Sequence, residues 1–241
     1  MAGSQGSLSF LKMTAALPSI PLFIGYILMI VVSGLWQRWT SPFQLKSLLV
    51  IHNFSCCIAN AVTLFGFSNA LIINGSAYGK TSSPVFLQAF KIYWIIKIVE
   101  LFDTVYLVLR HRRSQISFLH VYYRFSMLLL CDVARLFSPW PSIATFLALN
   151  SLVHVILYFY YGLVALTPEN PPKWDKSLTE MQIFAFGFGL FIAVNGYHYH
   201  KFCIYSILYI ITILVLFLNF YFHAYLTNQP QTIEIKTHKK K

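Results

Sequence analysis

Charged residues are scarce in this sequence, and acidic residues are the scarcest. Only 10% of the 241 residues are charged, with 7 Asp and Glu against 18 Lys and Arg, whereas 57% are hydrophobic. A water-soluble domain carries roughly 25% charged residues. Too few polar side chains remain to cover a surface in water, which excludes an ordinary soluble domain. Most of the surface is therefore predicted to face lipid.

Cysteine is also scarce, which excludes a disulfide framework and a thiolate metal site. The cysteines fall in or beside apolar stretches and show no metal-ligand spacing, so we interpret them as buried thiols: Cys56, Cys57, Cys131 and Cys203. A membrane di-iron site would need several clusters of histidines and carboxylates. The apolar stretches offer mainly His120 and His154. No metal is therefore predicted.

Long apolar runs dominate what is present. Seven stretches are candidates for crossing a bilayer, which takes a helix of roughly 20 residues, and the sixth is the shortest and weakest of them. They lie near residues 17–35, 48–71, 86–109, 116–136, 143–166, 181–194 and 203–225. Backbone amides in lipid must be hydrogen-bonded within their own segment, which favours helices. The sequence thus predicts an all-α membrane protein with seven transmembrane helices.

The domain organisation follows from these runs. A polar N-terminus at 1–16 precedes a single membrane domain at 17–226, and a basic tail at 227–241 ends the chain. Three prolines in the segment 167–176 stop any helix there. Because the apolar rhythm resumes directly afterwards, we interpret this segment as a loop within one domain.

Basic residues alternate in density between successive loops. The rich set comprises Arg38, Lys46, Arg110, Arg112, Arg113, Lys173, Lys176, Lys236, Lys239, Lys240 and Lys241, and the poor set Lys12, Lys80 and Lys201. The positive-inside rule then predicts a luminal N-terminus and a cytosolic C-terminus. In this topology the sequon at Asn74 lies in a luminal loop and is a glycosylation candidate. The net charge of +11 is explained by loops beside anionic lipid, so no nucleic-acid partner is predicted.

Ionisable residues inside the predicted spans are the main functional signal. Each costs at least ~2.5–3.5 kcal/mol on insertion scales, so such groups are expected to face the bundle interior and to serve a purpose. In the third span Lys97, Glu100 and Thr104 share a face, and Asp103 lies at its edge. Lys97 and Glu100 are spaced to form an ion pair. An ion pair that only fixes helix packing is the alternative interpretation.

Polar stripes recur on the next two spans. His120, Tyr123 and Arg124 share one face of the fourth, and the fifth carries a stripe at four- and three-residue steps: Asn150, His154, Tyr158 and Tyr161. Stripes on three consecutive spans predict a shared polar cavity.

Together these motifs resemble the ELO family of very-long-chain fatty acid elongases. Residues 97–104 fit its Lys-x-x-Glu-x-x-Asp-Thr signature, 114–122 read like the approach to its His-x-x-His-His box, and 150–154 fit Asn-x-x-x-His. Thr179 and Gln182 fit its Thr-x-x-Gln motif. Motif order and spacing agree over about residues 20–226.

The resemblance implies fold, reaction and place in the cell. Six of the seven helices would surround an acyl tunnel in the endoplasmic reticulum membrane. Long-chain acyl-CoA and malonyl-CoA would condense there to 3-ketoacyl-CoA, CO2 and CoA, without a metal or prosthetic group. Partners would be other elongases and the reductases and dehydratase of the elongation cycle.

The resemblance also implies the site residues. The catalytic positions would be His120, Tyr123, Arg124 and His154. The substrate-binding positions would be Lys97, Glu100, Asp103, Thr104, Asn150, Tyr158, Tyr161, Thr179 and Gln182.

The box departs from the family pattern at its last two positions, Tyr123 and Arg124, where the family has histidines. An imidazole with a pKa near 6.5 is a ready nucleophile and base. A phenol with a pKa of about 10 stays mostly protonated, and an arginine cannot act as a base, although it can hold an oxyanion or a CoA phosphate. The family's later Gln and His are also replaced, by Ala185 and Gly187. Two functions therefore stay open: an elongase that relies on its remaining histidines, and a catalytically impaired relative that binds acyl-CoA or regulates active elongases.

Two further interpretations concern the whole chain. A seven-span receptor or transporter fits the span count, but residues 132–135 do not reproduce the receptor triplet and the last span lacks Asn-Pro-x-x-Tyr. In the tail, Lys239 partly matches a dilysine retrieval signal, and a basic tail without a sorting role is the alternative.

Overall fold

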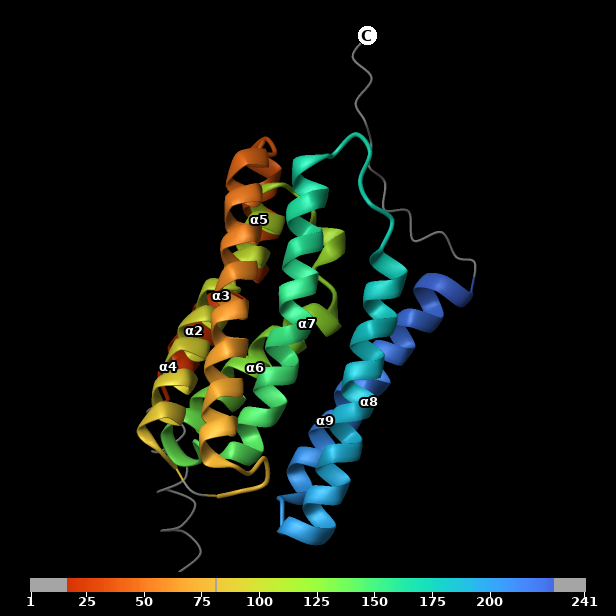
Figure 1. The fold of residues 1–241 in the computed structure, drawn as a ribbon. Coiled ribbons are helices and arrows are strands. Elements are labelled where there is room, and N and C mark those ends of the chain that lie inside the picture. Colours follow the sequence, from red (N-terminus) through yellow and green to blue (C-terminus); the bar gives the residue numbers. More distant parts are fainter. Residues whose placement is uncertain (1–16, 81, 228–241) are drawn as a thin grey trace, which may run out of the picture. The chain divides into compact units, whose positions relative to one another are not determined.

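The computed structural model describes residues 17–80 and 82–227, and within these ranges it is almost entirely helical and contains no strand (Figure 1). The predicted polar N-terminus at 1–16 and the tail beyond Thr227 lie outside the described residues. The all-α prediction is confirmed for the described chain.

The chain divides into two compact units, one ending at Pro172 and one beginning at Lys173. The first contains α2 (Ser19–Trp39), α3 (Lys46–Asn74), α4 (Pro84–Val99), α5 (Phe102–Leu109), η1 (Arg113–Gln115), α6 (Phe118–Phe137) and α7 (Pro141–Leu166). The second contains α8 (Asp175–His200), α9 (Ile204–Tyr221) and the π-helical η2 (Phe222–Leu226). The division falls in the proline-rich segment, and the single domain at 17–226 stays a prediction.

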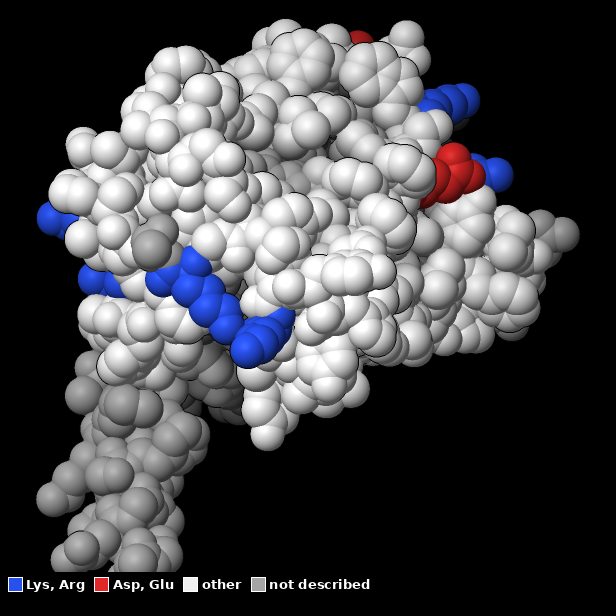
Figure 2. All heavy atoms as spheres, turned by 60° about the horizontal axis from the view of Figure 1, so that its bottom comes forward, with Lys and Arg blue, Asp and Glu red and all other residues white. Residues whose placement is uncertain are grey.

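Helices occur at all seven predicted stretches, and five of them are long and apolar enough to cross a membrane. These are α2, α3, α7, α8 and α9 together with η2. Many large apolar side chains on them are exposed, among them Phe65 and Ile72 on α3, and Figure 2 shows a surface that is mostly uncharged, with Lys and Arg in a few places. Such a surface is suited to lipid, so the chain is an integral membrane protein. The count of seven spans stays a prediction, because α4 is short and α6 carries three charged residues.

The third predicted span is not one continuous α-helix. It is divided at Glu100 and Leu101, where Leu101 N–H donates to the Ile98 carbonyl at 3.1 Å and Asp103 N–H donates to the Glu100 carbonyl at 3.2 Å. Bonds between residues three apart are those of a 3₁₀ turn, which tightens the helix and often marks a functional segment. The expectation of a single helix over 86–109 is therefore corrected to α4, a tight turn and α5.

Local signals in the sequence explain several helix ends. Ser83 caps the start of α4, because its hydroxyl accepts Phe86 N–H, and Pro84 follows as the first residue of the helix. Ser117 caps the start of α6, because its hydroxyl accepts His120 N–H at 3.2 Å, and this cap sets where the box helix starts. Gly75 ends α3 at a φ of 68°, a left-handed conformation that glycine adopts without strain.

The core of the first unit lies between α3, α4, α6 and α7. Phe67 of α3 packs edge-on against Phe90 and Tyr93 of α4, with ring centroids 5.3 Å and 5.6 Å apart. α3 and α7 lie side by side over much of their length. Gly162 of α7 permits this approach, because a Cβ there would come within 2.8 Å of the Phe54 ring. This packing holds α3, α4 and α7 around one shared interior.

The second unit is a pair of antiparallel helices. Lys201 ends α8 in a left-handed conformation, and Phe202 N–H donates back to the Gly196 carbonyl at 3.0 Å. Along the pair, Tyr221 O–H donates to Glu180 at 2.7 Å. These contacts hold α9 antiparallel against α8.

Candidate active site

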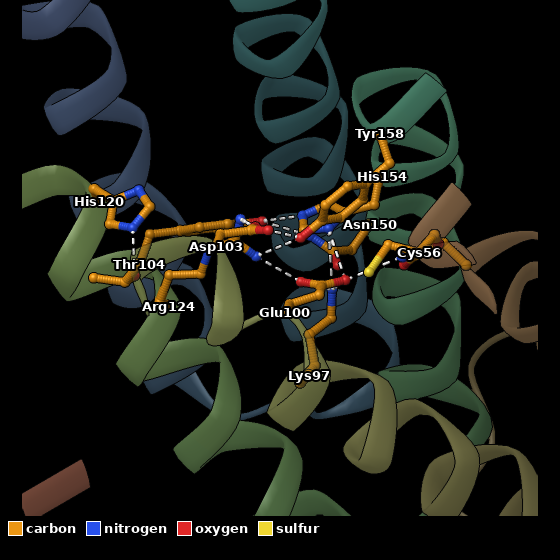
Figure 3. A network of polar contacts seen from close by, with 12 residues as sticks. Cys56, Lys97, Glu100, Asp103, Thr104, His120, Arg124, Asn150, His154 and Tyr158 are labelled. Atoms are coloured by element: carbon orange, nitrogen blue, oxygen red, sulfur yellow. Dashed lines mark hydrogen bonds and ion pairs between the residues drawn. The ribbon is translucent and has the colours of Figure 1, made fainter. Parts of the chain in front are cut away.

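The tight turn between α4 and α5 directs two carboxylates into the first unit, the buried Glu100 and the partly buried Asp103 (Figure 3). Lys97 Nζ donates to both carboxylate oxygens of Glu100, at 2.8 Å and 2.9 Å. Lys97 and Glu100 are only 5% and 1% exposed. The predicted ion pair is therefore present, and it lies in the interior rather than at the surface.

Arg124 of α6 joins the two carboxylates. Its Nη1 donates to Glu100 Oε2 at 2.7 Å, and its Nη2 is bonded to Asp103 Oδ2. Tyr158 of α7 bonds to the same pair, because its hydroxyl donates to Asp103 Oδ2 at 2.6 Å and accepts from Arg124 at 3.1 Å. Two cations and two anions thus balance each other. Such balance is what a buried charged cluster requires, since an unpaired ion would be costly there.

His154 of α7 lies between this cluster and the box. Its Nδ1 is 3.1 Å from Glu100 Oε1 and 3.2 Å from Lys97 Nζ, while its Nε2 is 3.4 Å from the Tyr123 hydroxyl. The ring is 2% exposed. His154 is therefore in contact with the acid on one side and with the substituted box position on the other.

A directional hydrogen-bond chain leads to Tyr123. The Tyr93 hydroxyl donates to Asn150 Oδ1 at 2.6 Å, and Asn150 Nδ2 donates to the Tyr123 oxygen at 2.6 Å. Because that oxygen already accepts one bond, the phenolic proton is directed onward, toward His154 or a bound group.

His120, the first histidine of the box, lies apart from His154, at the opposite end of the network (Figure 3). Its Nε2 is 2.8 Å from the Thr104 hydroxyl, which is 2.9 Å from the Tyr26 hydroxyl of α2. Its partner is thus a neutral hydroxyl. The structure does not bring His120 and His154 together, although both were predicted catalytic positions.

The remaining predicted positions lie outside the central contacts. Tyr161 of α7 packs edge-on against the Tyr158 ring at 6.2 Å. Thr179 and Gln182 lie on α8 of the second unit, where the Thr179 hydroxyl donates to the Asp175 carbonyl of its own helix. Asn74 is the last residue of α3, and its side chain donates to the Ser76 carbonyl at 3.0 Å.

Sequence reasoning missed the contribution of α3. His52 Nε2 is 2.8 Å from Asp103 Oδ1, and Asn60 Nδ2 donates to Glu100 Oε1 at 3.0 Å. Cys56 lies between them along the helix, and Thr63 continues the row with a 3.0 Å bond to Ser151 of α7. These residues are spaced four, four and three apart on one helical face, a pattern that the apolar stretch at 48–71 already contained.

Buried ions, imidazoles and apolar helices together define a membrane protein with a polar site in its interior. Comparison with known proteins identifies the family to which it belongs. The model of the ELO family (GNS1/SUR4 family) matches residues 12–233, so the chain belongs to the ELO family. The resemblance predicted from the motifs is confirmed.

Named relatives support the same family assignment. The chain is 30% identical over 223 residues to very long chain fatty acid elongase 7 of Rattus norvegicus, covering 80% of this chain and 75% of that protein. It is 30% identical over 229 residues to very long chain fatty acid elongase 4 of Mus musculus, covering 89% and 73%. The human elongase 4 is 30% identical over 224 residues, covering 86% and 71%.

Proposed function

We propose that this chain is a very-long-chain 3-ketoacyl-CoA synthase that condenses long-chain acyl-CoA with malonyl-CoA through His154. One observation carries the proposal: His154 Nδ1 lies against Glu100 while its Nε2 faces Tyr123. An imidazole that donates Nδ1–H to a carboxylate keeps a lone pair on Nε2, as a nucleophile or base requires.

The chemistry follows from that lone pair. Nε2 of His154 attacks the thioester carbonyl, a C–N bond forms, and the C–S bond breaks with its electron pair left on CoA sulfur. Malonyl-CoA then loses CO2, and the released electron pair forms a C–C bond to the acyl carbon. The C–N bond breaks and returns its pair to Nε2. Each turnover consumes one proton, which ends on the CoA thiol.

Tyr123 is suited to assist at the carbonyl. Asn150 donates to the phenol oxygen, so the phenolic proton can be donated to the thioester oxygen as negative charge develops there. Donors fixed in advance toward such an oxygen are among the strongest contributors to catalysis. The change from histidine to Tyr123 thus replaces a nucleophile with a hydrogen-bond donor.

The same proposal extends to the substrate, the location in the cell and the partner proteins. Family membership supports an acyl tunnel among the helices of an endoplasmic reticulum protein, no metal or prosthetic group, and cooperation with other elongases and the enzymes of the elongation cycle. Tyr161, Thr179 and Gln182 would contact acyl-CoA, and the basic loops would face the cytosol.

A second candidate function is a catalytically impaired relative that binds acyl-CoA or regulates active elongases. Arg124 favours it, because this residue stands where the family has a box histidine and its guanidinium is engaged by Glu100, Asp103 and Tyr158. An arginine so held cannot serve as a base.

Malonyl-CoA condensation in microsomes distinguishes the two functions. We expect the native chain to form radiolabelled 3-ketoacyl product from a panel of saturated and polyunsaturated acyl-CoAs. His154→Gln should lower the rate about 10²–10⁴-fold, the range for a lost acid–base or nucleophilic group. The exposed His223→Gln serves as control. A silent native chain that Tyr123→His/Arg124→His activates would instead establish the impaired relative.

A further inference from the structure

We propose that His52 supplies, from α3, the imidazole that the box lacks at Arg124, and that it provides the proton consumed in condensation. This role rests on the proposed function and adds a residue outside the box and outside the motifs of the sequence. His52 lies in the second predicted span, and the box is in the fourth.

The geometry places two imidazole–carboxylate pairs in one site. Nδ1 of His154 is 3.1 Å from Oε1 of Glu100, and Nε2 of His52 is 2.8 Å from Oδ1 of Asp103. Arg124 bonds both carboxylates and so connects the pairs. The residue that displaced the box histidine is therefore the one that links the site to an imidazole on another helix.

Charge favours His52 over His154 as the carrier of an extra proton. Glu100 has two cation partners, Lys97 and Arg124, whereas Asp103 has Arg124 alone within the described residues. Lys97 Nζ is also only 3.2 Å from His154 Nδ1, and its positive charge opposes a second one there. Asp103 therefore has fewer cation partners than Glu100, and a transient positive charge on His52 meets less repulsion than one on His154.

The other neighbours of His52 do not supply a competing charge. On its own helix the Cys56 thiol is 3.6 Å from Nε2. The Tyr106 ring of α5 and the Tyr158 ring of α7 contact it edge-on, with centroids 4.9 Å and 6.4 Å away. Asp103 is the charged group that faces it directly, and Arg124 lies beyond that carboxylate. His120 is less suited to the role, because its partner is the hydroxyl of Thr104.

The reaction needs such a carrier at a definite step. When the C–S bond of acyl-CoA breaks, the electron pair stays on sulfur and must be protonated. His154 is acylated at that moment, and Lys97 and Arg124 hold their protons in ion pairs. His52 can give the proton from Nδ1, keep its Nε2–H bond to Asp103, and regain a proton from water.

His52→Gln is the decisive variant. The glutamine amide can donate to Asp103 as Nε2 does, but it cannot carry a proton. We expect kcat to fall about 100-fold or more, while KM for acyl-CoA changes less than about threefold. His198→Gln, at the exposed end of α8, is the matched control with unchanged rates.

Complementation then separates chemistry from structure. If an imidazole is what matters, Arg124→His in the His52→Gln background should recover at least about tenfold in kcat. Added imidazole should likewise rescue His52→Ala, which provides a second test if the glutamine variant does not fold.

Each outcome is decisive. A native rate in His52→Gln overturns the role of His52 and leaves the proposed function intact. A loss that neither Arg124→His nor imidazole rescues means a structural role and overturns it as well. A native chain without condensation activity overturns the proposed function, and the role of His52 with it.

Discussion

At the scale of single residues, Arg124 connects the two halves of this site. It stands at a box position, yet it acts as the cation that the carboxylates of Glu100 and Asp103 share. Removing one partner of a buried ion pair leaves an uncompensated charge and costs about 3–5 kcal/mol, although replacing a whole pair with apolar residues can be neutral. The substitution at the box therefore changed the chemistry and the electrostatics together.

Arg124→Met should therefore strongly destabilise the protein, because Glu100 loses one cation partner and Asp103 loses its own. Arg124→Lys should recover only part of the loss, since an ammonium lacks the planar fork that spans both carboxylates. Heating in detergent followed by fluorescence-detected size-exclusion chromatography measures the midpoint.

The matched control is Lys176→Met. Lys176 is 3.8 Å from Glu180, and both side chains are about half exposed. Surface pairs of this kind contribute about 0–1 kcal/mol. Equal midpoints for Arg124→Met and Lys176→Met would contradict the view that Arg124 balances the carboxylates of Glu100 and Asp103.

At the scale of elements, the contact between α3 and α7 determines which residues can share the site. His52 and Asn60 come from α3, while His154 and Tyr158 come from α7. Gly162 allows the Phe54 ring to lie against α7, two residues from His52 in the chain. The distance between these helices therefore controls both stability and the site.

Gly162→Ala should lower the thermal midpoint, because its Cβ would come within 2.8 Å of the Phe54 ring and push α3 from α7. Gly187→Ala in α8 is the control, since a Cβ there meets nothing within 4 Å. Alanine is favoured over glycine in helices by about 1 kcal/mol, so the control should be neutral or more stable. If both variants melt alike, Gly162 does not set the helix contact.

At the scale of the whole molecule, the bilayer determines how the chain is oriented. The basic loops and the tail predict a cytosolic C-terminus and a luminal N-terminus. The described helices are suited to a bilayer because their exposed faces are rich in large apolar side chains, and the orientation stays a prediction.

Protease protection in sealed microsomes tests the orientation. A C-terminal epitope tag should be digested, while an N-terminal tag should survive until detergent opens the vesicles. Loss of the N-terminal tag before detergent would contradict the predicted topology. A glycan that Asn74→Gln removes would independently place the α3–α4 connection in the lumen.

The sequence by itself determined the all-helical class, the Lys97–Glu100 pair and the polar faces of the third, fourth and fifth spans. These depend on composition and on the helical repeat, which act within one segment. Tertiary structure decided that Arg124 joins Glu100 to Asp103, that His52 and Asn60 enter from α3, and that His120 lies apart from His154. It also decided the tight turn at Glu100. The physical reason is that helical periodicity determines which side chains share a face, whereas packing between helices determines which faces come into contact.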